Sequence, residues 1–237
     1  MNVSNKYHKR TWVPYRVKVY IRNRYRAFVF SRAMKSFINN PEKCAYPGSP
    51  VLRRLIYGWD NTLWSGLEEF LCACIHDVLK TEGPVLECGS GLSTILIGAV
   101  AKNRRIKIWS LESTEEWGSK VAKNLERYKL DSVHLCVTPI IRYDEYDWYD
   151  APFDKFPDRF ALIICDGPPS TTNGGRSGLV QVLKTRVGAG CVVLLDDASR
   201  SEEEALAKRW EADFSASLNI IGEKKPYFRM VIQSPPH

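Results

Sequence analysis

The sequence predicts an α/β domain with a mostly parallel sheet and helices on both faces. Segments typical of strands alternate with segments typical of helices from residue 84 to residue 217, and such alternation indicates a parallel sheet. The last two predicted strands, 219–222 and 227–233, are joined by only four residues. So short a connection permits an antiparallel hairpin but not a parallel crossover, which needs about a dozen residues or more. The sheet should therefore end in an antiparallel strand.

The elements follow one another in a regular order after the prolines at 41, 47 and 50, which indicate an irregular linker. Apolar residues then recur at helical spacing from Leu63 to Leu79, and Gly83-Pro84 ends that helix. Short apolar runs predict five strands, with helices between and after them. The strands are 84–89, 107–111, 133–137, 160–165 and 191–195, and the helices are 93–102, 115–128, 178–187 and 202–217. The stretch from 138 to Pro157 should be irregular.

The basic charge is concentrated near the N-terminus. Residues 1–40 contain ten Lys or Arg and no Asp or Glu, whereas the remaining residues carry 24 Lys or Arg against 27 Asp or Glu. We therefore divide the chain into a basic arm and linker, 1–50, and a domain, 51–237. The arm interleaves its cations with Tyr, Phe, Val and Ile. It is either an amphipathic helix on an anionic surface or a segment that packs on the domain with its cations in solvent.

Composition argues against several classes of protein. No apolar run reaches the ~18 residues of a membrane span, and no apolar stretch follows the basic N-terminus as in a secretion signal. The expected location is therefore the cytoplasm. The cysteines are odd in number, and several lie in apolar, strand-like runs, where they behave as small buried hydrophobic residues. Neither a disulfide framework nor a zinc site is expected.

The clearest motif, E-C-G-S-G-L-S-T at residues 87–94, lies where the first strand gives way to a helix. Open α/β sheets bind ligands in this crevice. Gly89 and Gly91 allow a tight turn and a close approach of the backbone to a ligand. A dinucleotide-binding loop would have a third glycine where this chain has Thr94. Glu87, before the turn, favours a cationic ligand over a pyrophosphate.

A second acid follows about twenty residues later, at the end of the second strand, in S-L-E-S. The carboxylate of this acid, Glu112, can accept hydrogen bonds from both hydroxyls of a ribose. An acid at a strand end is often only solvated. Glu112 therefore indicates a ligand site only in combination with Glu87, Gly89 and Gly91, which lie at the end of the preceding strand.

Together with I-I-C-D-G-P-P and L-L-D-D further along, these motifs resemble those of the class I S-adenosylmethionine (SAM)-dependent methyltransferases. Within that family they are similar to a little-characterised bacterial group with E-x-G-S-G-x-S-T and D-G-P-P motifs. The resemblance covers residues 60–233. It implies a Rossmann-like SAM methyltransferase fold, with a mostly parallel seven-stranded sheet and an antiparallel C-terminal strand. A nicotinamide-binding Rossmann domain is parallel throughout, so the C-terminal hairpin favours the methyltransferase.

The resemblance implies a site for SAM at the first two strand ends. The loop at Gly89–Gly91 would wrap the amino-acid moiety of SAM, and Glu112 would hold its ribose. The expected cofactor-binding residues are Glu87, Gly89, Ser90, Gly91, Ser93, Thr94, Glu112 and Ser113. The chain departs from the family pattern in two places. Ser93 replaces the last glycine of G-x-G-x-G, and no acid follows the third strand at Thr138-Pro139, so the adenine contacts stay unassigned.

Asp166-Gly167-Pro168-Pro169 follows the fourth strand, beside the transferred methyl group in this fold. Asp166 is the predicted catalytic residue. It would orient the acceptor, remove its proton or bind a metal, on a loop that the two prolines stiffen. The alternative is a polar strand end in solvent.

Asp196-Asp197 closes the fifth strand. With Asp166, this pair resembles the carboxylates that hold Mg²⁺ in catechol-type O-methyltransferases, and hard oxygen ligands suit that ion. Those enzymes carry an amide beside the second carboxylate, where this chain has Asp197. Asp197 can instead cap the following turn, so Mg²⁺ is one of two interpretations of these acids.

Two loops are candidates for the acceptor side. The acidic, aromatic stretch 143–150 either stacks its rings on a sugar or aromatic acceptor or packs them on a helix. Gly174-Gly175-Arg176 is a candidate mobile segment, and its arginine either binds an anionic group or lies in solvent.

The preferred hypothesis is methyl transfer from SAM to an oxygen of a small molecule or saccharide, an acceptor class to which family analogy points. One alternative is an RNA methyltransferase that grips phosphate with the arm, although no RNA-binding module is recognisable. Another is a non-catalytic protein with the SAM fold that binds an anionic membrane or a partner. Binding to a membrane through residues 1–40 would place the protein at the inner face of that membrane.

Overall fold

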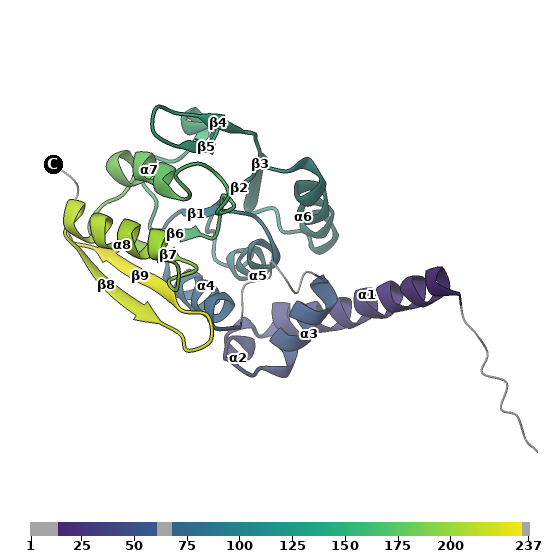
Figure 1. The fold of residues 1–237 in the computed structure, drawn as a ribbon. Coiled ribbons are helices and arrows are strands. Elements are labelled where there is room, and N and C mark those ends of the chain that lie inside the picture. Colours follow the sequence, from purple (N-terminus) through teal and green to yellow (C-terminus); the bar gives the residue numbers. More distant parts are fainter. Residues whose placement is uncertain (1–13, 61–67, 234–237) are drawn as a thin grey trace, which may run out of the picture.

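The structure, a computed structural model, describes residues 14–60 and 68–233 (Figure 1). They form a seven-stranded sheet in the order β3-β2-β1-β6-β7-β9-β8 and a separate hairpin, β4-β5. The strands are Val85–Cys88 (β1), Ile108–Glu112 (β2), Val133–Val137 (β3), Ile140–Arg142 (β4), Asp147–Tyr149 (β5), Leu162–Cys165 (β6), Val192–Leu195 (β7), Ala216–Ile221 (β8) and Tyr227–Ile232 (β9). The predicted fold class is confirmed, because β1, β2, β3, β6 and β7 are parallel and β9 runs antiparallel to its neighbours β7 and β8.

Helices cover both faces of the sheet. They are Tyr15–Asn39 (α1), Pro41–Cys44 (α2), Pro50–Trp59 (α3), Glu68–Lys80 (α4), Leu92–Ala101 (α5), Glu115–Tyr128 (α6), Val180–Thr185 (α7) and Ser201–Asp213 (α8), with 3₁₀ turns at Phe153–Lys155 (η1) and Ser177–Leu179 (η2). Alternate strand residues point to opposite faces. Val85 and Ile164 therefore pack towards α4 and α5, whereas Leu86 and Cys165 pack towards α7 and α8.

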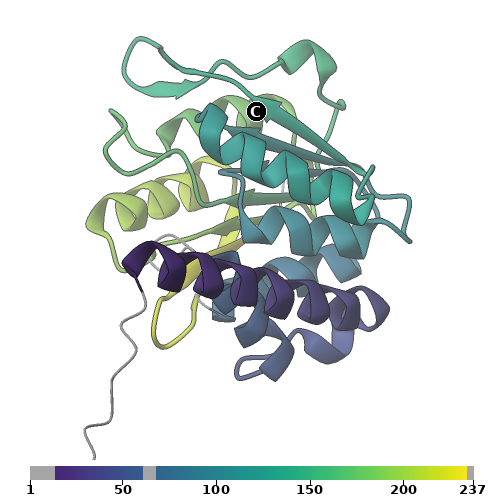
Figure 2. The same cartoon turned by 90° about the vertical axis from the view of Figure 1, so that its right-hand side faces the viewer.

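The N-terminal helices share the first of these cores. Phe30 and Phe37 of α1 are buried with Leu55 of α3 in the cluster that includes α4 and α5. The two helices touch at Gly58, where a Cβ would lie only 2.6 Å from the Cβ of Phe30. Figure 2 shows α1, in purple, running across the molecule beside α3. The boundary at residue 50 between arm and domain remains a proposal, and the C-terminal half of α1 packs with the domain.

The expectation of an irregular linker is wrong at two of its three prolines, which begin helices, whereas Pro47 does lie in an irregular turn. Pro41 is the first residue of α2 and Pro50 the first residue of α3. The hydroxyl of Ser49 accepts the Leu52 N–H at 3.4 Å and caps α3. Proline suits the first position of a helix because an N–H there would have no helical partner.

Three other expectations about the elements differ from the structure. Helix α8 ends at Asp213 instead of 217, because Ala216 and the following residues pair with β9. The stretch expected to be irregular up to Pro157 contains β4, β5 and η1. Helix α7 covers only Val180–Thr185 of the expected 178–187. The predicted start of the helix at Leu63 lies outside the described residues.

Candidate active site

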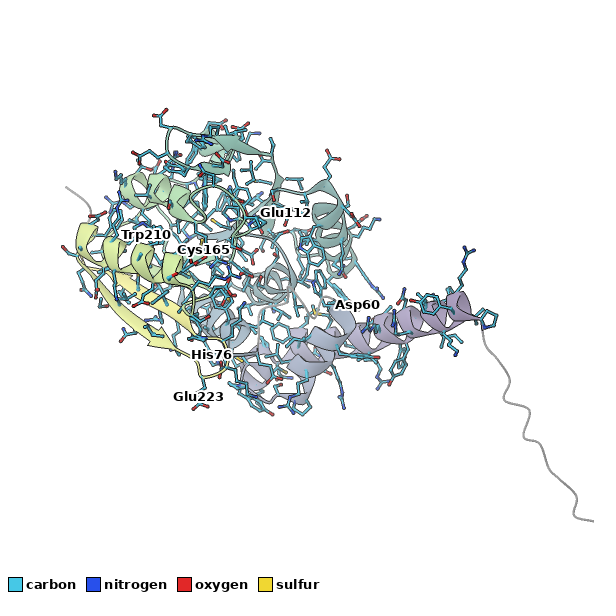
Figure 3. The ribbon with its side chains drawn as sticks, viewed as in Figure 1. Asp60, His76, Glu112, Cys165, Trp210 and Glu223 are labelled. Atoms are coloured by element: carbon cyan, nitrogen blue, oxygen red, sulfur yellow. The ribbon has the colours of Figure 1, made fainter. Side chains whose placement is uncertain are left out.

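The carboxyl ends of β1, β2, β6 and β7 meet at one edge of the sheet, around a cavity of about 800 Å³. Main-chain hydrogen bonds tie these ends together. The Gly89 N–H donates to the Leu111 carbonyl at 3.0 Å, and the Gly167 N–H donates to the Cys88 carbonyl at 2.7 Å. Glu112 and Cys165, labelled in Figure 3, end β2 and β6 at this edge. The predicted site residues that line the cavity are Gly89, Ser90, Gly91, Ser93, Glu112, Ser113, Asp166 and Asp197.

Gly89 and Gly167 pack directly against each other at the floor of the cavity. Gly89 has a φ of +92°, and a Cβ there would lie 2.8 Å from the Gly167 nitrogen. A Cβ on Gly167 would in turn lie 2.4 Å from the hydroxyl oxygen of Tyr149. The left-handed backbone and the close contact both require glycine at position 89, and the contact alone requires it at position 167.

Glu87 supports the glycine loop from beneath and does not line the cavity. Its Oε1 accepts the Ser93 hydroxyl, and its Oε2 accepts the hydroxyls of Thr94 and Ser110, all at 2.6 Å. The Thr94 oxygen also accepts the Gly91 N–H at 2.8 Å. Complete burial raises the pKa of Glu87 to about 7, against the lowering effect of the three hydroxyls. Glu87 and Thr94 therefore fix the shape of the loop through hydrogen bonds.

Glu112 does line the cavity, and its carboxylate is held in one orientation. Its Oε1 accepts the N–H groups of Ser113 and Thr114 at 2.8 and 2.9 Å, and the Thr114 hydroxyl at 3.0 Å. Its Oε2 accepts only the Ser90 hydroxyl, at 2.7 Å, among the residues that the structure describes. A carboxylate oxygen has about two acceptor sites. Oε2 can therefore accept a further hydrogen bond from a ligand.

Two tryptophans from different helices form one wall of the cavity. Trp117 of α6 donates to the Ser90 carbonyl at 2.6 Å, and its ring meets that of Trp59 of α3 edge-on with centroids 5.9 Å apart. The Lys120 ammonium lies 4.4 Å from both ring centroids and donates to the Trp59 carbonyl at 2.7 Å. Sequence reasoning missed this wall, because Trp59 belongs to a helix that it does not predict.

Arg176 is buried and lines the cavity, so of the two alternatives for its side chain the solvated one is wrong. Its Nη2 donates to the carbonyl of Asp166 at 2.9 Å, to the carboxylate of Asp166 at 3.3 Å and to that of Asp197 at 2.9 Å. Its Nη1 donates to the Asp196 carbonyl at 2.5 Å and lies 3.9 Å from the carboxylate of Glu203. One side chain thus joins the ends of β6 and β7 to α8.

Three carboxylates converge beside this arginine. One oxygen from each of Asp166, Asp196 and Asp197 lies within 4.8 Å of the other two. Two cations already hold them, however. Lys225 binds Asp196 and lies 3.2 Å from Asp197, and Arg176 binds Asp166 and Asp197. An added Mg²⁺ would be repelled by both cations, so these residues do not fit a metal site.

Asp166 lies in surroundings that favour its protonated form. Burial and the neighbouring carboxylate of Asp196 raise its pKa well above the usual range, although Arg176 and Lys225 lower it. Asp196 Oδ1 is buried and has no hydrogen-bond partner in the described part of the chain. About 30% of the Asp166 side chain is exposed, and it lines the cavity. Asp166 can therefore exchange a proton with a bound molecule.

The aromatic stretch 143–150 forms much of the β4-β5 hairpin. Trp148 and Tyr149 are buried, so the packing interpretation holds for these two rings. Trp148 lies against Gly178, where a Cβ would be 2.4 Å from the ring. Tyr149 lines the cavity beside Gly167. Tyr143 and Tyr146 stack on each other with centroids 5.6 Å apart and do not line this cavity.

The sheet order, the antiparallel β9 and the glycine loop after β1 together define the Rossmann-like fold of SAM-dependent methyltransferases. The structure is similar to precorrin-6y C5,15-methyltransferase from Geobacter metallireducens, with a TM-score of 0.56 and 13% identity over 73% of this chain and 92% of that chain. It is also similar to the C-terminal domain of precorrin-6Y C5,15-methyltransferase from Rhodobacter capsulatus, with a TM-score of 0.54 and 12% identity over 79% and 96% of the two chains.

A third similar structure is the S-adenosylhomocysteine (SAH)-bound methyltransferase PaMTH1 from Podospora anserina. It has a TM-score of 0.54 and 12% identity, over 94% of this chain and 99% of that chain. No protein-family model matches the chain, and no curated protein matches its sequence. At these identities the comparisons establish the fold.

Proposed function

We propose that this protein is a SAM-dependent methyltransferase that methylates an oxygen atom of a small molecule or a saccharide. The observation that carries the proposal is that three strand ends share one cavity. The Gly89–Gly91 loop, Glu112 and Asp166 all line it. A cofactor that contacts both the Gly89–Gly91 loop and Glu112 would direct its methyl group towards Asp166, where an acceptor has room to bind.

The residues at the first two strand ends suit SAM. Gly89, Ser90, Gly91 and Ser93 line the cavity where the amino-acid moiety would lie, and Glu112 with Ser113 suits the ribose hydroxyls. The Ser90 and Ser93 hydroxyls donate to Glu112 and Glu87 and can still accept a hydrogen bond from a ligand. Glu87 and Thr94 act on the cofactor through the loop that they hold. The cavity volume of about 800 Å³ falls within the roughly 300–1,000 Å³ of ligand pockets.

Asp166 is the proposed base. When bound, SAM supplies an electrophilic methyl group on its sulfonium. Asp166 would accept the proton of the acceptor hydroxyl as the oxygen gains the methyl group, the S–CH₃ bond breaks and SAH leaves. Burial and Asp196 raise the pKa of Asp166, so its deprotonated carboxylate is a stronger base than an ordinary aspartate. Arg176 holds Asp166 from behind, and the cavity walls supply the alignment that a displacement reaction needs.

A nucleic acid is the less favoured acceptor. The cations that line the cavity are Arg176, Arg200 and Lys225, and each lies within 3.2 Å of the Asp197 carboxylate. They are therefore already paired within the protein, and phosphate groups would compete with Asp197 for them. A small neutral acceptor such as a sugar hydroxyl meets no such competition.

Calorimetric titration with SAH tests the proposal, with NAD as the control ligand. We expect micromolar binding of SAH alone, and loss of that binding in Gly89→Arg. Gly190→Arg is the matched control, because Gly190 also has a positive φ but lies in an exposed turn with open space around it. If the wild-type protein binds neither ligand, or if both variants bind SAH normally, the proposed cofactor site is wrong. SAH binding without turnover of any screened acceptor would favour the non-catalytic alternative.

A further inference from the structure

The two halves of helix α1 have different environments. Its C-terminal half buries Phe30, Met34 and Phe37 against the domain. Its N-terminal half, 15–29, contains no buried residue and extends beyond the domain in Figure 1. Tyr25 and Arg26 contact Tyr57 of α3, but most of this half is exposed in the described part of the chain, although it is rich in apolar side chains. A solvent-exposed helix with this composition needs an explanation.

The exposed apolar side chains form a row. Val17, Ile21, Tyr25 and Phe28 are 43, 57, 58 and 56% exposed. Residues spaced by three or four lie on one face of an α-helix, one above the other. These four are spaced by four, four and three, so they form one stripe. By the same geometry Val17, Ile21 and Phe28 lie opposite the buried Phe30 and Phe37, whereas Tyr25 lies at the edge of the stripe, where its ring meets that of Tyr57 of α3.

The stripe is flanked by positive charge. Helix α1 carries seven Lys or Arg and no Asp or Glu. Arg16, Lys18, Arg22 and Arg24 are exposed, whereas Arg26 is paired with Asp60, which directly follows α3. The outward side of the helix therefore combines apolar side chains with unneutralised cations, which complements a surface that is anionic outside and apolar within.

We propose that residues 15–28 of α1 form a docking surface for an anionic lipid bilayer, with the stripe inserted between the headgroups and the cations on lipid phosphates. A second copy of the chain is disfavoured, because two such helices would bring unneutralised cations together. RNA is disfavoured because only Tyr25 and Phe28 of the stripe offer rings on which bases can stack, whereas Val17 and Ile21 offer none. No described helix is long and apolar enough to cross a bilayer. The proposed docking surface would contact only one face of the bilayer.

The contact between α1 and α3 gives the docking surface a fixed relation to the cavity. Arg26 of α1 binds Asp60, which directly follows Trp59 in the cavity wall. A helix anchored at the membrane would therefore hold the cavity at a defined place relative to the lipid. The docking surface does not depend on the proposed chemistry and can be tested without activity.

Co-sedimentation of the full chain with vesicles tests this inference. We expect binding to phosphatidylcholine vesicles that contain phosphatidylglycerol, and little binding to pure phosphatidylcholine. Arg22→Glu with Arg24→Glu should weaken binding by about 25-fold or more, because each basic residue near an anionic surface contributes about fivefold. Ile21→Ser with Phe28→Ser should weaken it as well, because the lost side chains no longer enter the apolar layer.

Two control variants match these changes elsewhere. Lys123→Glu with Lys184→Glu makes the same change of charge on exposed positions of α6 and α7. Ile220→Ser with Ile221→Ser removes exposed apolar side chains from β8. Both controls should bind vesicles like the wild type. Equal losses in the controls would overturn the proposal, as would vesicle binding that Ile21→Ser with Phe28→Ser leaves unchanged.

Two further outcomes identify a different occupant of the surface. Tighter, salt-sensitive binding to single-stranded RNA than to vesicles, lost in the charge variant, would replace lipid with nucleic acid. A dimer in analytical ultracentrifugation that Ile21→Ser with Phe28→Ser dissociates would replace lipid with a second copy. Either result contradicts the lipid proposal.

Discussion

The guanidinium of Arg176 binds Asp166 twice, at its main-chain carbonyl and at its carboxylate. Arg176 is 3% exposed, and it also binds the carboxylate of Asp197. It therefore neutralises acids that would otherwise repel one another at the adjacent strand ends. The residue proposed as the base depends for its position on a side chain ten residues further along the same connection between β6 and η2.

Arg176→Met should lower the free energy of unfolding by about 3–5 kcal/mol, because it leaves buried carboxylates without their cation. Urea denaturation measures the change. Arg200→Met is the control, since Arg200 binds the same Asp197 but its side chain is 40% exposed, and its loss should cost about 1 kcal/mol or less. Similar losses of unfolding free energy in the two variants would show that the buried carboxylates depend no more on Arg176 than on Arg200.

Asp166→Asn should leave the affinity for SAH nearly unchanged and lower kcat by roughly 10²–10⁴-fold, the usual contribution of a general base. A base acts in its deprotonated form, so wild-type kcat should rise with pH through the raised pKa of Asp166. The Asn variant should lose this rise. Asp158→Asn, at an exposed position, is the control. An unaltered pH profile in Asp166→Asn would assign the base elsewhere.

Glu87 should make stability depend on pH. Burial raises its folded-state pKa to about 7 from the ordinary 4.5, so the folded state binds the proton more tightly than the unfolded state. Its contribution to the free energy of unfolding is complete below pH 4.5 and declines, by ~3 kcal/mol, as the pH rises towards 7. Glu87→Gln should remove this decline, and urea unfolding at several pH values measures it. The exposed Glu126→Gln should retain the wild-type profile.

Glu112→Gln should weaken SAH binding by about 1.5–3 kcal/mol, the range for a hydrogen bond to a charged group. Ser113 and Thr114 both donate to Oε1, so the amide oxygen of Gln would keep that position. Its NH₂ group would then replace Oε2, which could no longer accept a hydrogen bond from the ligand. Calorimetry measures the affinity, with the exposed Glu115→Gln as control. Equal affinities of the two variants would exclude Glu112 from the site.

Methyl transfer should not respond to EDTA or to added Mg²⁺, because Lys225 and Arg176 already hold the three converging aspartates. The rate of transfer with each additive measures this. Lys225→Ser removes one of the two cations and should allow Mg²⁺ to raise the melting temperature of the variant. Loss of wild-type activity in EDTA, with recovery on adding Mg²⁺, would restore the metal hypothesis.

Much of the fold, and the part of the site at the ends of β1 and β2, follow from local patterns. The alternation of strand and helix and the short final connection predict a parallel sheet with an antiparallel end. Gly89, Gly91 and Glu112 could be found because the carboxyl ends of parallel strands meet at one edge. Residues of the right type directly after consecutive strands therefore converge even though they are far apart in the sequence.

Only the tertiary structure decided the remainder. The sequence names Asp166, Asp196 and Asp197 but cannot show that Arg176 and Lys225 neutralise them, because these cations come from loops whose paths depend on packing. It also places Glu87 among the ligand contacts, whereas three hydroxyls hold it beneath the loop. Helix α3 has a local signal, because Ser49-Pro50 marks a helix start and Leu52, Leu55 and Trp59 recur at helical spacing. Only the packing of the tertiary structure shows that Trp59 reaches the cavity. Local propensity thus specifies the elements and the strand ends, while the pairing of buried charges and the cavity walls depends on which distant segments meet.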